Sequence, residues 1–188
     1  CECGHIAIDP FDQDIVYGGC YDGVIERRNH KIDQGRAINV WPDNPMGHGA
    51  EGMRYRFQWN FPIFFSPHDK DKLYTASNHM HVSEDGGDSW TIISPDLTRN
   101  DPSKLGPSGG PITKDNTSVE YYCTIFAAAE SPKKAGIFWA GSDDGLVHLS
   151  QDGGENWTNV TPPNSPQRNM MNCIDINPHE EGSIYLAA

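Results

Sequence analysis

Long apolar runs are missing from this chain of 188 residues. A membrane-spanning helix needs about 20 consecutive apolar residues, so we expect no insertion into a membrane. No signal peptide is visible either. The chain begins at the start of one strand-like pattern and ends inside another, so we expect a fragment of a longer protein. The missing targeting signal therefore carries no information about location.

Basic residues are scarce, with 14 Lys and Arg against 26 Asp and Glu, for a net charge of −12. Proteins that bind nucleic acid or anionic membranes need surplus positive charge to neutralise phosphates. The balance therefore argues against both kinds of partner. Solubility is the simplest explanation of the acidic surplus.

Cysteines are few, and their spacing matches no zinc, haem or redox motif. We therefore expect no metal and no cofactor. Two of the five, Cys123 and Cys173, lie in alternating apolar runs, which predicts buried free thiols. A disulfide between Cys1 and either Cys3 or Cys20 remains open.

What the chain does have is a repeated octapeptide, Ser-x-Asp-Gly-Gly-x-x-Trp, at residues 83–90 and 150–157. An Asp side chain can accept backbone hydrogen bonds inside a turn, and Gly permits a positive φ. Each copy follows one β-rich run and precedes another, which predicts a hairpin turn with the Trp packed beneath it. The residues expected to hold these turns are Ser83, Asp85, Gly87 and Trp90, and Ser150, Asp152, Gly154 and Trp157.

Four units of the chain can be laid over one another, and each begins with strand, Pro-containing turn and strand. They cover about residues 5–44, 61–96 and 121–163, and a truncated unit begins at 171. Repeated four-stranded antiparallel meanders without a helical period predict an all-β fold, namely a β-propeller fragment in a single domain. The remaining blades must come from missing sequence or from another chain.

Long connections between the units should emerge on one face of the propeller, opposite the two repeated turns. Aromatic, amide and guanidinium groups in these loops suit a polar ligand with flat surfaces. The candidate ligand-binding residues are Arg54, Arg56, Trp59, Asn60 and Asn116. The candidate carboxylates are Asp22, Asp96, Glu120, Asp143 and Asp144. The alternative is that Arg56 and Glu120 form an ion pair between blades and that Trp59 belongs to the core.

Several motifs resemble those of bacterial sortilin-like, glycosyl-hydrolase-like propellers with Asp-box (BNR) repeats. Besides the two octapeptides, they are Arg56-Phe-x-Trp59-x-x-Pro-Ile63, Ser66-Pro-His68, Ser94-Pro-Asp-Leu-Thr98, Gly109-Gly-Pro-Ile-Thr113 and Gly141-Ser-Asp-Asp-Gly145. The resemblance implies that the Asp boxes are structural turns away from the ligand face. It also implies a secreted, periplasmic or cell-surface protein.

The sequence leaves three functions open. The first is an extracellular module that binds a glycan or a protein ligand, such as a peptide, at its axial face. The second is a glycoside hydrolase, xyloglucanase-like or sialidase-like, which requires two carboxylates about 5–9.5 Å apart. Neither the arginine triad of sialidases nor the carboxylate pair of xyloglucanases maps onto a motif here. The third is a structural propeller in a larger assembly.

Overall fold

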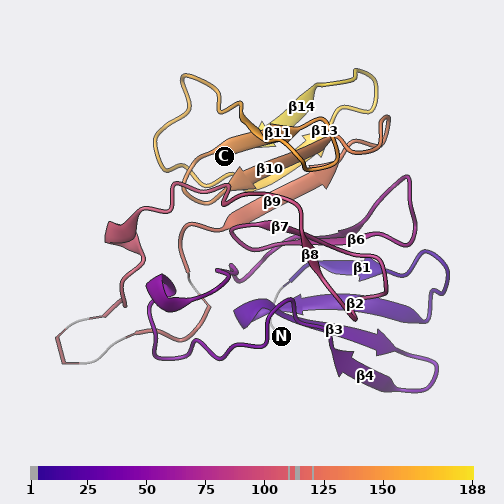
Figure 1. Cartoon of the computed structure of the whole chain (residues 1–188), viewed down its shortest axis with the longest axis horizontal. Helices are drawn as coiled ribbons and strands as arrows, with labels where there is room; N and C mark the ends of the chain where they lie inside the picture. Colours follow the sequence, from indigo (N-terminus) through magenta and orange to yellow (C-terminus); the bar gives the residue numbers. More distant parts are fainter. Residues whose placement is uncertain (1–3, 110, 113–114, 120) are drawn as a thin grey trace.

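The computed structural model describes residues 4–109, 111–112, 115–119 and 121–188. Nearly all regular structure in them is β, in three four-stranded antiparallel sheets and one two-stranded sheet. The sheets lie beside one another in chain order, from the indigo N-terminal strands to the yellow C-terminal ones (Figure 1). This is the architecture of a β-propeller fragment, so the predicted fold class is confirmed.

Within each sheet the strands follow chain order, as in a meander. The first sheet contains β1 (Ile6–Ile8), β2 (Ile15–Cys20), β3 (Val24–Asn29) and β4 (Gln34–Ala37). The second contains β5 (Ile63–Phe65), β6 (Leu73–Ala76), β7 (Met80–Ser83) and β8 (Thr91–Ile92). The third contains β9 (Ile125–Glu130), β10 (Phe138–Ser142), β11 (Val147–Ser150) and β12 (Thr158–Asn159). The last contains β13 (Cys173–Ile176) and β14 (Ile184–Ala187).

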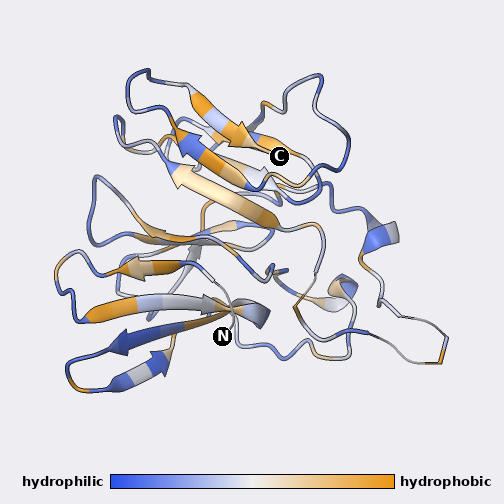
Figure 2. Cartoon of the chain, turned by 180° about the vertical axis from the view of Figure 1, so that it is seen from behind, coloured by the Kyte–Doolittle hydropathy of each residue, from blue (hydrophilic) through white to orange (hydrophobic). Residues whose placement is uncertain are grey.

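The hydrophobic core is divided among the spaces between neighbouring sheets. Tyr17 and Ile25 of the first sheet pack with Ile63 and Leu73 of the second. Equivalent clusters join the second sheet to the third and the third to the last. Apolar colouring is concentrated on the strands, and the loops are mostly hydrophilic (Figure 2). Each blade is therefore stabilised by burying apolar surface against its neighbour.

The middle strands are the most deeply buried. All five residues of β10 are buried, as is typical of a strand covered on both faces. In β13 the burial alternates, and Ile174 is buried while Cys173 and Asp175 are exposed. The prediction that Cys173 is buried is therefore wrong, because the phase of the strand turns its side chain outward.

The other cysteines differ in environment. Cys123 is a free thiol with no exposed surface, as predicted, and burial raises its pKa to about 12. Cys20 is disulfide-bonded. Cys1 and Cys3 lie outside the described residues.

The two repeated turns at residues 83–90 and 150–157, here the Asp-Gly-Gly turns, have the same internal hydrogen bonds. In the first, the Asp85 carboxylate accepts hydrogen bonds from the Ser83 hydroxyl at 2.8 Å and from the Ser89 backbone N–H at 2.9 Å. Gly87, with φ of 93°, donates its N–H to the Ser83 hydroxyl at 2.8 Å. Hydrogen bonds to Ser89 and Ser83 lower the pKa of Asp85 to about 2.

In the second turn the Asp152 carboxylate accepts hydrogen bonds from the Ser150 hydroxyl at 3.0 Å and from the Asn156 N–H at 2.9 Å. Gly154 donates its N–H to the Ser150 hydroxyl at 2.9 Å. Both aspartates are therefore engaged in holding their own hairpins.

Long loops occupy the opposite end of the strands from the β1–β2 and β3–β4 turns (Figure 1). They carry two short 3₁₀ helices, η2 (Ala50–Gly52) and η3 (Pro102–Lys104). A third, η1 (Tyr21–Gly23), forms the turn between β2 and β3. No helical segment among the described residues has the length and hydropathy that crossing a membrane requires.

Candidate functional site

The loops between blades enclose a groove of about 370 Å³ on the loop-rich side, here called the aromatic groove. Its lining combines aromatic, amide and thioether side chains from the segments that lead into β5, β9 and β13, with one residue of β9 itself. The lining residues are Gln58, Trp59, Asn60, Tyr121, Tyr122, Phe126 and Met170. None of them is charged, so the groove offers flat apolar surface with neutral hydrogen-bonding groups.

Trp59 is half-buried at the wall of this groove. Its ring stands edge-on to Tyr21, with centroids 6.3 Å apart and planes at 88°. The indole Nε1 of Trp59 and the side-chain Oδ1 of Asn60 are shielded from solvent, and neither has a hydrogen-bond partner among the described residues. One donor and one acceptor without partners are costly unless water or a ligand satisfies them.

Gln58 connects the two sides of the groove. Its Oε1 accepts a hydrogen bond from the Trp59 backbone N–H at 2.9 Å. Its Nε2 donates to the Tyr121 carbonyl oxygen at 2.9 Å and to the Asp143 carboxylate at 3.2 Å. A single amide thus joins the loop before β5 to the loop before β9 and to the turn after β10.

Asp143 lies behind the groove and is 4% exposed. Its Oδ1 accepts the Thr124 backbone N–H at 2.9 Å, and its Oδ2 accepts the Thr124 hydroxyl at 2.8 Å together with the Gln58 amide. Burial raises the pKa of Asp143 to about 6, and the neighbouring Asp144 adds to the rise, whereas the Thr124 and Gln58 hydrogen bonds oppose it.

Arg56 is buried and belongs to an ion pair. Its guanidinium contacts the Asp96 carboxylate at 2.6 Å and donates to the Cys123 carbonyl oxygen at 2.9 Å. Asp96 also accepts a hydrogen bond from Asn78 at 2.9 Å. Burial raises the pKa of Asp96, but hydrogen bonds from Thr98 and Asn78 and the charge of Arg56 outweigh it, so the pKa is lowered. The ion pair of Arg56 is thus with Asp96, and Glu120 lies outside the described residues.

Two further candidate carboxylates lie in turns between the second and third strands of blades. Asp144 is buried and accepts the Ser142 hydroxyl at 2.5 Å and the Arg99 backbone N–H at 2.7 Å. Asp22 sits in η1 with φ of 67°, and burial raises its pKa. Its Oδ1 is shielded from solvent and has no hydrogen-bond partner among the described residues.

Arg54 is exposed and is not among the residues that line the groove. Its guanidinium stacks on the Trp41 ring at 4.1 Å from the centroid and donates to the Tyr55 hydroxyl at 3.3 Å. This geometry is a cation–π contact, which holds the side chain against the surface.

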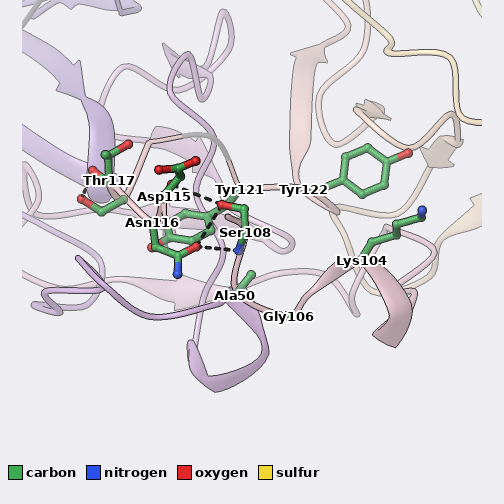
Figure 3. Close-up of a pocket in the computed structure, with 10 residues that line it drawn as sticks. Ala50, Lys104, Gly106, Ser108, Asp115, Asn116, Thr117, Tyr121 and Tyr122 are labelled. Carbon is green, nitrogen blue, oxygen red and sulfur yellow. Dashed lines mark hydrogen bonds between the residues drawn. The ribbon is translucent and has the colours of Figure 1, made fainter. Parts of the chain in front are cut away.

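Asn116 lines a second, smaller cavity of about 80 Å³ that shares Tyr121 and Tyr122 with the aromatic groove. Figure 3 shows Asn116 beside Ser108 and Tyr121, with Lys104 and Tyr122 farther along the cavity. The Asn116 Oδ1 accepts the Ser108 backbone N–H at 2.9 Å. Its Nδ2 is shielded from solvent without a partner among the described residues.

The structure therefore brings Trp59 and Asn60 together in one groove and places Asn116 in the adjoining cavity. Sequence reasoning missed the rest of the groove, whose members are Gln58, Tyr121, Tyr122, Phe126 and Met170. The Tyr121-Tyr122 doublet at the end of a long loop was an available signal. Gln58 carried none, because its role depends on partners far away in the sequence.

Comparison with known proteins identifies the fold of this chain. No family model matches the sequence, and no curated protein matches it. An ancestral GH74 enzyme is similar in structure, with a TM-score of 0.58 and 17% identity, over 97% of this chain and 21% of that one. YCF48 bound to D1 peptide is also similar, with a TM-score of 0.50 and 15% identity, over 93% of this chain and 43% of that one.

This chain therefore spans about a fifth of the length of the GH74 enzyme and less than half that of YCF48. At such low identity the likeness concerns architecture, since one fold hosts many functions. The chain is part of a β-propeller.

Proposed function

We propose that this part of the propeller is a binding module and that its aromatic groove binds a glycan without cleaving it. The observation that carries the proposal is the groove itself, whose lining combines several aromatic rings with Trp59 and Asn60, each of which has one shielded polar atom without a partner among the described residues. Its volume of about 370 Å³ falls in the range of roughly 300–1,000 Å³ common for ligand sites. Aromatic faces suit the apolar face of a sugar ring, and amides suit its hydroxyl groups.

A neutral ligand fits best because none of the seven lining residues is charged. A peptide is the competing ligand, and YCF48 carries a peptide in a similar fold. The groove favours the glycan because its polar groups are scattered amides and hydroxyls around flat rings. A sugar hydroxyl can accept a hydrogen bond from Trp59 Nε1 and can donate one to Asn60 Oδ1.

A glycoside hydrolase is the alternative that Asp143 invites, because a carboxyl with pKa about 6 has the value a general acid needs. A general acid must reach the oxygen that it protonates. Asp143 is 4% exposed, and both of its oxygens accept hydrogen bonds from Thr124 or Gln58. Asp96 and Asp144 likewise accept at both oxygens. These occupied carboxylates support binding over turnover.

The motifs quoted above support the finer proposal of a sortilin-like propeller with Asp-box turns at Asp85 and Asp152. We further propose one propeller domain across residues 1–188 and a secreted, periplasmic or cell-surface location. The disulfide at Cys20 supports that location, because disulfides persist mainly in oxidising compartments. The location can be tested by fusing the full-length protein to a reporter enzyme and comparing the reporter activity inside the cell with the activity outside the cytoplasmic membrane.

A glycan array followed by calorimetry on the full-length protein tests the function. Trp59→Ala should weaken glycan binding by about thirtyfold or more, the effect expected of a central aromatic anchor. Trp41→Ala is the matched control, because Trp41 is exposed and lies outside the groove. The control should bind within about twofold of wild type.

Three results would contradict the proposal. Glycan binding that survives Trp59→Ala moves the site elsewhere. Binding confined to a parallel peptide library makes the ligand a peptide. Release of reducing sugar that disappears in Asp143→Asn makes the protein a hydrolase.

A further inference from the structure

The shape of the aromatic groove depends on one amide. Gln58 Oε1 accepts the Trp59 N–H at 2.9 Å, which anchors the wall that carries the indole. Gln58 Nε2 donates to the Tyr121 carbonyl oxygen at 2.9 Å, which anchors the facing wall. The two partners demand opposite ends of the amide, so the side chain cannot be turned over without breaking both bonds.

The same amide is held from behind by Asp143, whose Oδ2 accepts from Gln58 Nε2 at 3.2 Å. Asp143 is itself fixed by the Thr124 N–H and hydroxyl at the entrance to β9. The chain of contacts therefore runs from a buried carboxylate through one amide to both walls. Groups positioned by such supporting hydrogen bonds keep a binding site in a single geometry.

We propose that Gln58 and Asp143 are positioning residues that set the separation of the Trp59 and Tyr121 walls and thereby the affinity of the groove. The effect on affinity rests on the binding function proposed above. The positioning of Trp59 by Gln58 and Asp143 can be tested without a ligand. It assigns a role to Gln58, and gives Asp143 a task other than proton transfer to a substrate.

The arrangement makes the groove sensitive to pH. The ionised Asp143 only accepts hydrogen bonds, so it suits the Thr124 and Gln58 donors together. On protonation it gains a proton that the Thr124 hydroxyl can accept by rotating, whereas the Gln58 Nε2–H₂ group can only donate. The hydrogen bond to Gln58 therefore weakens in acid. The titratable groups whose charges act with Asp143 are Asp144, Tyr122 and Cys123.

The pKa of about 6 for Asp143 places this change within reach of ordinary buffers. Above that pH the carboxylate is charged and holds Gln58, and below it the Trp59 wall loosens. Of the other groups, Tyr122 and Cys123 have raised pKa values and stay neutral near pH 6.

The test is ¹⁹F NMR of the ligand-free, full-length protein labelled with 5-fluorotryptophan, with the Trp59 resonance identified by its loss in Trp59→Phe. In wild type this resonance should shift with a midpoint near pH 6, the pKa of Asp143. In Asp143→Asn and in Gln58→Met the midpoint near pH 6 should vanish. Asp115→Asn is the matched control, because Asp115 is an exposed acid beside the neighbouring cavity, and it should titrate as wild type does.

A wild-type Trp59 resonance that does not move between pH 5 and 7 would overturn the proposal, and this measurement needs no substitution at Gln58 or Asp143. An unaltered titration in Asp143→Asn or Gln58→Met would overturn it as well. When a glycan ligand is in hand, Gln58→Met should weaken its binding about tenfold at pH 7.5. If no glycan binds, the proposed function is wrong. The pH titration of the Trp59 resonance decides separately whether Gln58 and Asp143 position Trp59.

Discussion

The indole Nε1 of Trp90 donates a hydrogen bond to the backbone carbonyl oxygen of Ile38, in the preceding blade, at 2.9 Å. Trp157 repeats the contact one blade later, with the Ile93 carbonyl oxygen at 2.9 Å. Each Asp-Gly-Gly turn therefore fastens its own blade to the one before it. The repeated tryptophan serves the junction between blades as well as its own hairpin.

Replacing Trp90 by Phe should lower the free energy of unfolding by about 0.5–1.5 kcal/mol, because one hydrogen bond is lost while an aromatic ring remains. Urea denaturation of the full-length protein measures the change. Trp41→Phe is the matched control, since within the part of the chain that the structure describes no hydrogen bond of that indole joins two blades, and it should leave the midpoint unchanged. Equal midpoints for Trp90→Phe and wild type would show that the inter-blade hydrogen bond adds nothing.

Asp85→Asn should reduce stability in a way that depends on pH. The folded-state pKa of Asp85 is lowered to about 2 from an ordinary value of 3.8. A lowered pKa means that the folded state favours the charged form, so this contribution is fully present above pH 3.8 and is lost as the pH falls towards 2. The difference in melting temperature between variant and wild type should therefore be largest above pH 4 and shrink in stronger acid.

The control for this experiment is Asp88→Asn, an exposed acid in the same turn. Its difference from wild type should be smaller, because Asp88 does not accept the hydrogen bonds that close the turn. A difference for Asp85→Asn that is constant from pH 2 to 6 would contradict the role assigned to its charge.

The fold was within reach of the sequence because its signals are local. The hydrogen bonds of Ser83 and Asp85 that close the first Asp-Gly-Gly turn come from residues within four positions. Strand order then follows from short turns, which force neighbouring strands to pair. A motif that contains its own partners can be read without knowledge of tertiary structure.

The groove could be predicted only in part, because its contacts span long separations. Gln58 meets Tyr121 and Asp143, 63 and 85 residues away. Arg56 was expected to pair with Glu120 or bind a ligand, and it pairs with Asp96 in the loop after β8. Whether the Cys173 side chain is buried or exposed depends on which face of β13 it occupies. A shift of one residue in the expected alternation reverses that prediction.

Breaking the Arg56–Asp96 pair should be strongly destabilising, because the side chains are 7% and 23% exposed. Removing one partner of a buried pair typically costs about 3–5 kcal/mol, since the other charge is left without compensation. Arg56→Met should therefore lower the urea midpoint substantially. Arg36→Met, in an exposed pair with Asp88, is the matched control and should cost about 1 kcal/mol or less.

The double variant Arg56→Met with Asp96→Asn separates charge from packing. It should recover part of the loss, because no unpaired charge remains. Strict additivity of the two single effects would show that the pair is not coupled.

Cys123 and Cys173 should react with thiol reagents at very different rates. Cys173 is exposed, whereas Cys123 has no exposed surface and burial raises its pKa to about 12. The thiolate is the reactive form, so Cys123 is protected both by access and by protonation. Native alkylation at pH 8 followed by peptide mass spectrometry should label Cys173 within minutes and Cys123 only after denaturation.

The matched control is the Cys173→Ser variant, which removes the exposed thiol of this segment. Its native protein should show no fast labelling at either position, and denaturation should still reveal Cys123. Fast native labelling of Cys123 would mean that the start of β9 opens, and with it the Thr124 contacts that hold Asp143. The alkylation rate at Cys123 thus also reports how firmly the rear wall of the aromatic groove is closed. A rate that rises below pH 6, after correction for thiolate content, would place that opening under the control of Asp143.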